Sequence, residues 1–365
     1  MRLRVVDGGE LATALAAALG GGDPVAPIPE PRLLTALRAG EPVTEADAAA
    51  VVTTSGSTGE PKAVVLTRAA VRFAVGATHE RLGGSGNWVC ALPVQHVAGL
   101  MTVARSVVAG TDLRFARGDL ADLPAAVDRT YVSLVAAQLD RALGEPETTS
   151  RLRDYAAVLV GGGALPPGLR ERAGAARVRI VTTYGMSETC GGCVYDGVPL
   201  DGVRVELDAG RISLGGPMAF AGYRLRPELT AAVLDGGDLV HTQDRGRWSD
   251  GRLQVLGRVD DVVISGGENV DLAVAQRAAD AEFGERAVLL LGVPDERWGT
   301  RVVALTTAEL TLAEVRGRLE PLLGRAATPK ELRQVGELAY TSIGKIDRTA
   351  LLRSWAGKGE YGDAG

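Results

Sequence analysis

The stretch VVTTSGSTGEPKAVVL, residues 51–66, joins two apolar runs through a loop rich in glycine and hydroxyl side chains. It begins with an apolar, β-branched run, which predicts a buried strand, and it ends with a second apolar run. Residues 54–59 between the two runs contain four hydroxyl side chains and two glycines. Backbone amides can approach an anion closely at glycine, and hydroxyl groups add hydrogen bonds. We therefore expect the phosphates of a nucleotide to bind at Thr54, Ser55, Gly56, Ser57, Thr58, Gly59 and Lys62.

This loop is not a Walker A sequence, because Pro61 precedes Lys62 and Ala63 follows it. A solvated Ser/Thr/Gly linker is the alternative, and it is disfavoured because a strand enters the loop and an apolar run leaves it. The loop resembles the phosphate-binding signature of the adenylate-forming superfamily, which includes acyl-CoA synthetases, nonribosomal peptide adenylation domains and luciferases. Members of that superfamily usually have glycine where this chain has Ala63.

A second motif, TTYGMSET at residues 182–189, resembles the Tyr-Gly-x-Thr-Glu motif of the same superfamily, with Ser187 in place of the usual threonine. An aromatic ring at Tyr184 can stack on a purine, and hydroxyl groups can bind phosphate. Glu188 can hold Mg²⁺ through oxygen, as hard cations require. The resemblance also implies adenine contacts at an earlier glycine turn. Together the two segments predict nucleotide binding at Gly162, Gly163, Ala164, Tyr184, Gly185, Ser187, Glu188 and Thr189.

Further motifs follow in the order typical of the superfamily. By resemblance, Asp244 binds the ribose, which suits a carboxylate that accepts two hydroxyl hydrogens, and Arg258 contacts ribose or phosphate. The same comparison makes Asp260 the hinge on which a C-terminal lid turns. Gly266 and Gly267 match a glycine turn that lines a tunnel for the pantetheine arm of CoA.

His96 and Lys345 are the two residues that we expect beside the reacting carboxylate. His96 lies in a Pro-x-x-His-x-x-Gly sequence, residues 93–99, which resembles the motif next to the acyl pocket, and a pocket-lining role is favoured over proton transfer. An isolated histidine after a strand would more often be structural. Lys345 lies in TSIGKIDR, residues 341–348, which matches the Gly-Lys motif of the superfamily and implies the catalytic lysine.

Predicted strands and helices alternate along the chain, which indicates an α/β fold. A helix capped by Thr67 is expected at residues 68–82. Strands are expected at residues 87–92, 112–115, 131–135, 156–160 and 179–183. The resemblance implies a large N-terminal domain of mixed β-sheets flanked by helices, residues 1–259, with a shortened N-terminal portion. A small mobile α+β lid, residues 260–355, and a polar tail, residues 356–365, then follow.

Composition excludes several classes of protein. The net charge is −5 and no basic stripe is present, which argues against a nucleic-acid partner. No segment has the length of a membrane span, and the N-terminus lacks the apolar core of a signal peptide. The three cysteines fit a reducing compartment, so we expect a cytoplasmic protein. Cys190 and Cys193 have CxxC spacing, for which a redox role is left open and a zinc site is disfavoured.

The resemblance implies that ATP activates a carboxylate as an acyl-adenylate, and that the acyl group then passes to the thiol of CoA. ATP, Mg²⁺ and CoA are the expected small molecules. The short N-terminal portion and the run TCGGCVYDGVPL, residues 189–200, most resemble compact o-succinylbenzoate–CoA ligases of menaquinone biosynthesis, which act on an aromatic dicarboxylate. Three alternatives remain: another small acyl- or aryl-CoA ligase, an adenylation enzyme that loads a carrier protein, and a catalytically silent nucleotide-binding module. A homodimer is left open.

Overall fold

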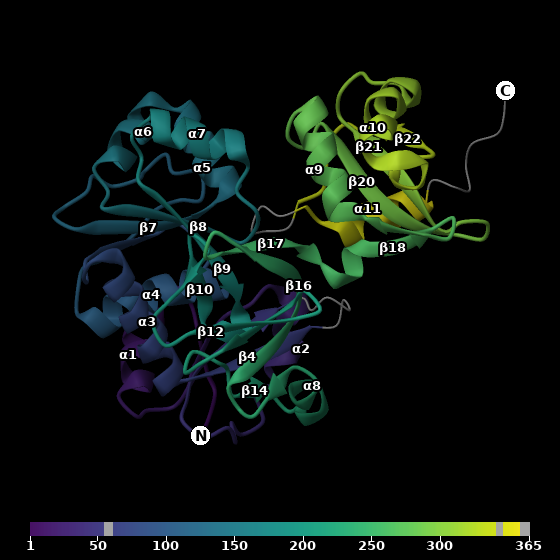
Figure 1. Cartoon of the computed structure of the whole chain (residues 1–365). Coiled ribbons are helices and arrows are strands. Elements are labelled where there is room, and N and C mark those ends of the chain that lie inside the picture. Colours follow the sequence, from purple (N-terminus) through teal and green to yellow (C-terminus); the bar gives the residue numbers. More distant parts are fainter. Residues whose placement is uncertain (55–60, 341–345, 358–365) are drawn as a thin grey trace. The chain divides into compact units, whose positions relative to one another are not determined.

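The computed structural model describes residues 1–54, 61–340 and 346–357 (Figure 1). The chain divides into two compact units. The N-terminal unit contains Met1–Asp208, Ile212–Thr242 and Trp248–Leu253, and the C-terminal unit contains Ala209–Arg211, Gln243–Arg247 and the chain from Gln254 onward. The division falls within a few adjacent strands, a little before the domain border predicted at residues 259 and 260.

The first sheet of the N-terminal unit holds the base of the predicted phosphate loop. It consists of β1 (Arg4–Val6), β2 (Val25–Pro27), β3 (Ala48–Thr54), β4 (Lys62–Thr67) and β14 (Gly222–Tyr223), in the order β1-β2-β3-β4-β14. β3 and β4 are antiparallel, and Thr54 lies opposite Lys62 in their register. The nearby helices are α1 (Leu11–Leu19), η1 (Pro31–Leu33) and α2 (Leu34–Leu37). The buried strand predicted at the start of residues 51–66 is therefore present as β3.

The second sheet is mostly parallel and has the order β11-β10-β9-β8-β7-β5-β6. Its strands are β5 (Asn87–Cys90), β6 (Leu113–Phe115), β7 (Thr130–Val135), β8 (Ala157–Gly161), β9 (Ile180–Met186), β10 (Gly191–Tyr195) and β11 (Val198–Pro199). Neighbouring strands in the series β6-β5-β7-β8-β9 are parallel, whereas β10 runs antiparallel to β9. Because the carboxyl ends of parallel strands meet at one edge, the segments that follow β5, β8 and β9 gather where ligands bind in sheets of this kind.

Helices cover both faces of this second sheet. They are α3 (Arg68–Leu82), α4 (Val97–Ala109), α5 (Ala136–Gly144), α6 (Pro146–Arg153) and α7 (Pro167–Ala175). Val132 and Val158 pack with α5, α6 and α7, and their neighbours Tyr131 and Leu159 pack on the opposite side. Figure 1 shows α5, α6 and α7 grouped over β7 and β8, with α3 and α4 away from them. Two buried faces explain why these strands are continuous apolar runs.

A third sheet has the order β12-β13-β16-β15, with β17 paired to β16. Its elements and the segments around them are η2 (Ser187–Thr189), β12 (Arg204–Asp208), β13 (Arg211–Gly215), α8 (Pro227–Ala231), β15 (Leu234–Asp235), β16 (Leu239–Ser249) and β17 (Arg252–Arg258). The division into two units passes through β13, β16 and β17.

The C-terminal unit contains a small sheet of order β19-β18-β21-β20, with β22 parallel to β21. Its elements are η3 (Val259–Asp261), β18 (Val262–Ser265), β19 (Glu268–Asp271), α9 (Leu272–Phe283), β20 (Val288–Asp295), β21 (Gly299–Thr306), α10 (Leu312–Ala327), β22 (Leu332–Gln334) and α11 (Arg348–Gly357). Leu290 and Ala304 pack against α9 and α10, whereas Leu289 and Leu305 pack against Leu351 of α11.

The predicted α/β fold is confirmed, with several mixed sheets flanked by helices. The helix expected at residues 68–82 is α3, where Thr67 accepts a hydrogen bond from Ala70 N at 3.0 Å and Gly83 ends the helix with φ of 86°. The five expected strands are β5 to β9, with ends within three residues of the prediction. None of the helices in the described part of the chain has the length and apolar character that a bilayer crossing needs.

Candidate active site

The predicted phosphate loop begins and ends on the β3–β4 hairpin. Thr54 is half-buried at the end of β3, and Lys62 begins β4 directly opposite it. The predicted phosphate ligands Ser55, Gly56, Ser57, Thr58 and Gly59 lie outside the described residues. Lys62 is held by an aromatic ring, because its ammonium group lies 5.0 Å from the centre of the Tyr223 ring.

Tyr223 also contacts Glu188, the predicted magnesium ligand. Its hydroxyl donates to Glu188 Oε1 at 2.6 Å, and only 6% of Glu188 is exposed. Burial, and then the charge of Glu188, raise the pKa of Tyr223, so the phenol stays protonated and acts as the donor. Within the described part of the chain, no group donates to the other carboxylate oxygen, Oε2.

This arrangement fits a magnesium–nucleotide complex. Among the described residues there is no group of three or more acidic, histidine or cysteine side chains that could hold a metal ion. Mg²⁺ in nucleotide sites usually takes one or two carboxylate oxygens and completes its shell with phosphate oxygens and water. Glu188, with one oxygen held by Tyr223 and the other without a donor, suits such a single-carboxylate role.

Thr189 requires a correction. The prediction gives its hydroxyl to a phosphate, but the residue is fully buried. The hydroxyl donates to Gly191 O at 2.8 Å and accepts from Met186 N at 3.0 Å. Thr189 therefore braces the turn between β9 and β10 and has no surface for a nucleotide. Burial of a residue inside a motif depends on what packs over the turn, which the motif itself does not encode.

Gly185 has a structural reason to be glycine. A Cβ at this position would lie 2.0 Å from the carbonyl oxygen of Gly191, because β10 pairs closely with β9. Its neighbours Tyr184 and Ser187 are both half-buried. Gly185 thus lets the antiparallel strand approach while the two flanking side chains remain partly accessible.

The other site residues predicted in the N-terminal unit lie near the carboxyl edge of the parallel strands. Gly162 follows β8 with φ of 83°, and Gly162, Gly163 and Ala164 are exposed. His96 precedes the first residue of α4, which follows β5, and its Nε2 lies 3.8 Å from Glu30 Oε1. Glu30 is not among the residues predicted from sequence, and no motif around it would have indicated this contact.

In the C-terminal unit, Asp244, Arg258 and Asp260 form a second group. Arg258 donates to both oxygens of Asp260, at 2.8 and 2.9 Å, and lies 3.9 Å from Asp244 Oδ1. The hydrogen bond to Asp260 raises the pKa of Arg258. Burial opposes ionisation of Asp260, but Arg258 lowers its pKa overall. The predicted ribose ligand, the predicted nucleotide-binding arginine and the predicted hinge residue are thus neighbours.

Gly266 and Gly267 form the two-residue turn of the β18–β19 hairpin. Their φ angles are 62° and 86°, the left-handed values that such turns require. A Cβ on Gly266 would also lie 2.6 Å from the Trp298 ring, so a larger residue does not fit. Lys345, the predicted catalytic lysine, lies outside the described residues.

Arg105 is not among the residues predicted from sequence, although a charge inside the apolar helix at 97–108 is a visible signal. It lies on α4 and is only 5% exposed. Its guanidinium lies 4.8 Å from the Trp88 ring centre and makes long contacts of 3.4 Å to Ser133 Oγ and 3.5 Å to Tyr195 Oη. In the described part of the chain its Nε has no hydrogen-bond partner and no carboxylate pairs with it. Burying a charge without a carboxylate partner is costly, so an anionic group that reached Arg105 would be bound favourably.

Comparison with known proteins agrees with these observations. Residues 7–247 match the family described as AMP-binding enzyme. The chain is 43% identical over 371 aligned residues to a probable 2-succinylbenzoate–CoA ligase of Mycobacterium tuberculosis, with 96% of each chain covered. This chain belongs to the AMP-binding enzyme family.

Two solved structures resemble this AMP-binding enzyme closely. One is a variant of Escherichia coli MenE with bound OSB-AMS, with a TM-score of 0.78, 25% identity and coverage of 97% of this chain and 87% of that one. The other is o-succinylbenzoate CoA synthetase (MenE) from Bacillus subtilis in complex with the acyl-adenylate intermediate OSB-AMP. Its TM-score is 0.73 at 25% identity, with coverage of 88% of this chain and 71% of that one.

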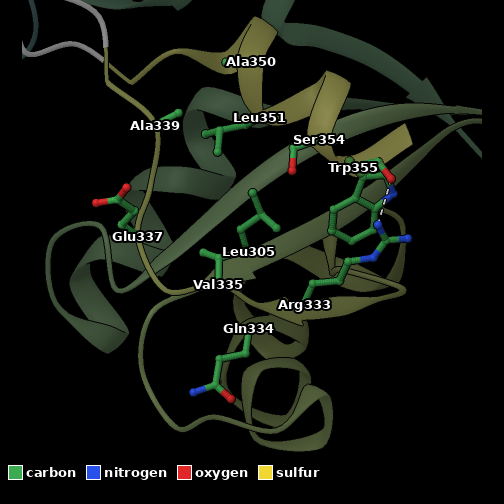
Figure 2. A pocket seen from close by; sticks show the side chains of 10 residues that line it. All are labelled: Leu305, Arg333, Gln334, Val335, Glu337, Ala339, Ala350, Leu351, Ser354 and Trp355. Atoms are coloured by element: carbon green, nitrogen blue, oxygen red, sulfur yellow. Dashed lines mark hydrogen bonds between the residues drawn. The ribbon is translucent and has the colours of Figure 1, made fainter. Parts of the chain in front are cut away.

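The AMP-binding enzyme also has a pocket of about 450 Å³ in its C-terminal unit, shown in Figure 2. It is lined by Leu305, Arg333, Gln334, Val335, Glu337, Ala339, Ala350, Leu351, Ser354 and Trp355. The Arg333 guanidinium lies 3.8 Å from the centre of the Trp355 ring and donates to Trp355 O at 2.8 Å. None of the predicted site residues that the structure describes lines this pocket.

Cys190 and Cys193 are free and fully buried in this AMP-binding enzyme. Burial raises the pKa of Cys193 to about 12, and it also raises the pKa of Cys190, with a further contribution from Cys193. A thiol must ionise before it reacts, so both groups are inert at neutral pH. Their environment therefore disfavours the redox role that the CxxC spacing leaves open.

Proposed function

We propose that this protein converts 2-succinylbenzoate to its CoA thioester, with ATP as co-substrate and an acyl-adenylate as intermediate. The 43% identity to the Mycobacterium tuberculosis ligase over nearly the whole chain supports this activity. The similarity to a MenE structure that holds OSB-AMP supports the intermediate.

The choice of substrate rests on the 43% identity to the Mycobacterium tuberculosis 2-succinylbenzoate–CoA ligase, and the buried guanidinium of Arg105 is our candidate partner for the second carboxylate. An aromatic dicarboxylate retains one carboxylate after the other has reacted, and that group needs a partner inside the acyl pocket. Arginine binds a carboxylate with two parallel hydrogen bonds, and Arg105 has no carboxylate partner among the described residues. We assign Arg105 to the second carboxylate of the substrate.

In the first half-reaction, the substrate carboxylate attacks the α-phosphorus of ATP, a C–O–P linkage forms, and the bond to pyrophosphate breaks. We assign Lys62, Thr54 and the donors of residues 55–59 to the phosphates. Donors and positive charge at this position would offset the charge that develops in the transition state. Lys345 bridges the substrate carboxylate and the α-phosphate. When bound, Mg²⁺ near Glu188 adds positive charge at the phosphates.

The remaining nucleotide contacts follow the motifs. Tyr184 and the Gly162–Ala164 turn are assigned to adenine, Ser187 to phosphate, and Asp244 to the ribose. His96 lines the acyl pocket beside Glu30. Arg258 binds Asp260 through Nε and one terminal nitrogen, so its other terminal nitrogen is the one that we assign to ribose or phosphate.

In the second half-reaction, the lid of residues 260–355 turns about Asp260 and withdraws Lys345. The CoA thiolate then attacks the acyl carbonyl, a C–S bond forms, and AMP leaves. Gly266 and Gly267 are assigned to the pantetheine tunnel. We place the reaction in the cytoplasm, where ATP and CoA are available, and a homodimer stays a prediction.

The test combines purified protein, ATP, Mg²⁺, CoA and a panel of acids that includes 2-succinylbenzoate, benzoate and a medium-chain fatty acid. Products are identified by mass spectrometry and pyrophosphate release is followed in parallel. We expect 2-succinylbenzoate to exceed the other acids by at least about 100-fold in kcat/KM, since a buried polar site rejects a substrate that leaves it unpaired. A different preferred acid would indicate another acyl- or aryl-CoA ligase. Transfer to a carrier-protein thiol but not to CoA would indicate a carrier-loading enzyme, and absence of pyrophosphate with every acid would indicate a silent module.

A further inference from the structure

The short strand β14 joins two motifs that lie far apart in the sequence. Gly222 and Tyr223 pair with Val65 and Val64 of β4, the strand that leaves the phosphate loop. The pairing extends on both sides of β14, because Ala221 N donates to Val65 O at 2.9 Å and Arg224 N donates to Ala63 O at 2.8 Å. Tyr223 is therefore held in register with the base of the loop, two residues from Lys62.

Other contacts keep Tyr223 rigid. Arg224 is buried, and its guanidinium donates to the carbonyl oxygens of Leu37, Arg38, Glu41 and Pro42. Tyr223 N donates to Thr230 Oγ1 at 2.8 Å, and the Tyr223 ring meets Phe220 edge-on at 5.0 Å. Phe220 N donates to the backbone carbonyl of Glu188 at 2.9 Å, so the Glu188 backbone is tied to the same segment.

The Tyr223 side chain makes two polar contacts, one through its hydroxyl and one through its ring face. The hydroxyl donates to Glu188 Oε1 at 2.6 Å, and the ring face lies 5.0 Å from the Lys62 ammonium. A carboxylate at a helical turn has several rotamers, and a hydrogen bond from a rigid phenol selects one of them. The same bond occupies one carboxylate oxygen and leaves the other without a donor in the described part of the chain.

We propose that Tyr223 is a positioning residue that holds Glu188 ready for the cation of the magnesium–ATP complex, and this proposal rests on the proposed function. The phenol fixes the carboxylate, and the ring supports Lys62. Tyr223 does not touch the reacting atoms. It lowers the cost of binding the metal–nucleotide complex because Glu188 is already ordered in the free protein.

A purely structural tyrosine is the competing explanation, because Tyr223 also packs in the apolar core. Tyr155 provides the matched control. It is equally buried, and its hydroxyl donates to Pro124 O at 2.7 Å, in a different core cluster without predicted site residues. Both tyrosines lose one buried hydroxyl when changed to phenylalanine. Only Tyr223→Phe also releases a predicted metal ligand, and it keeps the ring that faces Lys62.

The experiment measures ATP binding by calorimetry, once with EDTA and once with Mg²⁺, for the wild type, Tyr223→Phe, Tyr155→Phe, Glu188→Gln and the double variant Tyr223→Phe/Glu188→Gln. We expect Tyr223→Phe to reduce the Mg²⁺-dependent gain in affinity by roughly fivefold to tenfold, as loss of a charge-assisted hydrogen bond to a ligand would. ATP affinity in EDTA should change less than about twofold, since the ring and Lys62 remain. Tyr155→Phe should leave the gain unchanged, and Tyr223→Phe should have no further effect once Glu188→Gln has removed the carboxylate.

The proposal is overturned if Tyr223→Phe keeps the wild-type gain, if it weakens ATP binding equally with and without Mg²⁺, or if its effect adds fully to that of Glu188→Gln. A wild type without any Mg²⁺-dependent gain also overturns it. Thermal melting checks that each variant folds, and Glu188→Asp, which shortens the carboxylate away from the phenol, reports on the same contact if Tyr223→Phe does not fold. These titrations contain no carboxylic acid substrate, so they test the role of Tyr223 independently of turnover. A protein that binds magnesium–ATP as expected but does not turn over 2-succinylbenzoate would refute the proposed function alone.

Discussion

Replacing Arg105 with methionine should weaken recognition of the substrate without lowering the stability of the protein. Methionine keeps most of the apolar stem of the arginine and fills a similar space against Trp88, but it removes the charge. In the free protein the lost hydrogen bonds are weak, because those to Ser133 and Tyr195 are 3.4 and 3.5 Å long and Nε has no partner in the described part of the chain. The other loss is the charge contact with the Trp88 ring, whose apolar packing methionine keeps. The melting temperature should therefore stay the same or rise, since a buried unpaired charge is removed.

The effect on substrate should be large. One or two charge-assisted hydrogen bonds to a buried carboxylate contribute about 3 kcal/mol, which corresponds to a loss of roughly 150-fold in kcat/KM. A mono-acid analogue without the ring carboxylate, 4-oxo-4-phenylbutanoate, makes neither bond. Its kcat/KM should change by less than about threefold, so the preference for the dicarboxylate should nearly disappear. Arg105→Lys should lie in between, because it keeps the charge and loses the two-pronged geometry.

The assay is steady-state pyrophosphate release with each acid, together with thermal melting of each variant. Arg224→Met is the matched control, because Arg224 is equally buried but donates to four backbone carbonyls. Its loss should lower the melting temperature and affect both acids alike, since several carbonyl groups lose their donor. Arg105 does not bind the second carboxylate if Arg105→Met slows both acids equally, or if it destabilises the protein as Arg224→Met does.

Three further outcomes are expected. Lys345→Ala should abolish adenylate formation and largely spare thioester formation from a supplied acyl-adenylate, and equal loss in the two separately measured half-reactions would contradict its assigned role. Thr67→Ala should lower the free energy of unfolding in urea by about 1 kcal/mol, because the cap on Ala70 N is lost, whereas Thr67→Ser should keep it. Burial, and then the charge of Arg105, lower the pKa of His79 from its ordinary 6.5 to about 4, so between these pH values the unfolded chain binds a proton that the native chain does not. Stability should therefore fall as pH drops from 6.5 to 4, and a melting temperature for His79→Gln that falls as steeply would argue against this cause.

Local patterns were sufficient for much of the fold. The α3 helix begins at Thr67 and ends at Gly83 because both signals act within one helical turn. The apolar runs that predict β5 to β9 are recognisable because both faces of that sheet are buried, so each strand is continuous in hydrophobicity. The turn at Gly266 and Gly267 likewise follows from the left-handed conformation that glycine adopts without strain.

Other features of the site could not be obtained in this way. Thr189 belongs to a nucleotide-binding motif but is closed off by β10. Tyr223 lies on a strand of two residues, too short for any periodicity, and its contact with Glu188 exists only because β14 pairs with β4. Arg105 is a visible charge in an apolar helix, but its lack of a partner depends on which groups the sheet brings beside it.

The order of the chemical groups along the chain is already present in the sequence: a hydroxyl-rich loop, an acidic motif, the carboxylate predicted to bind ribose and a late lysine. Those signals lie in neighbouring residues, where backbone preference and side-chain type act over a few positions. Only the tertiary structure decided which side chains meet, such as Tyr223 with both Glu188 and Lys62. Such contacts depend on strand pairing between distant segments, whose register is set by packing of the whole core.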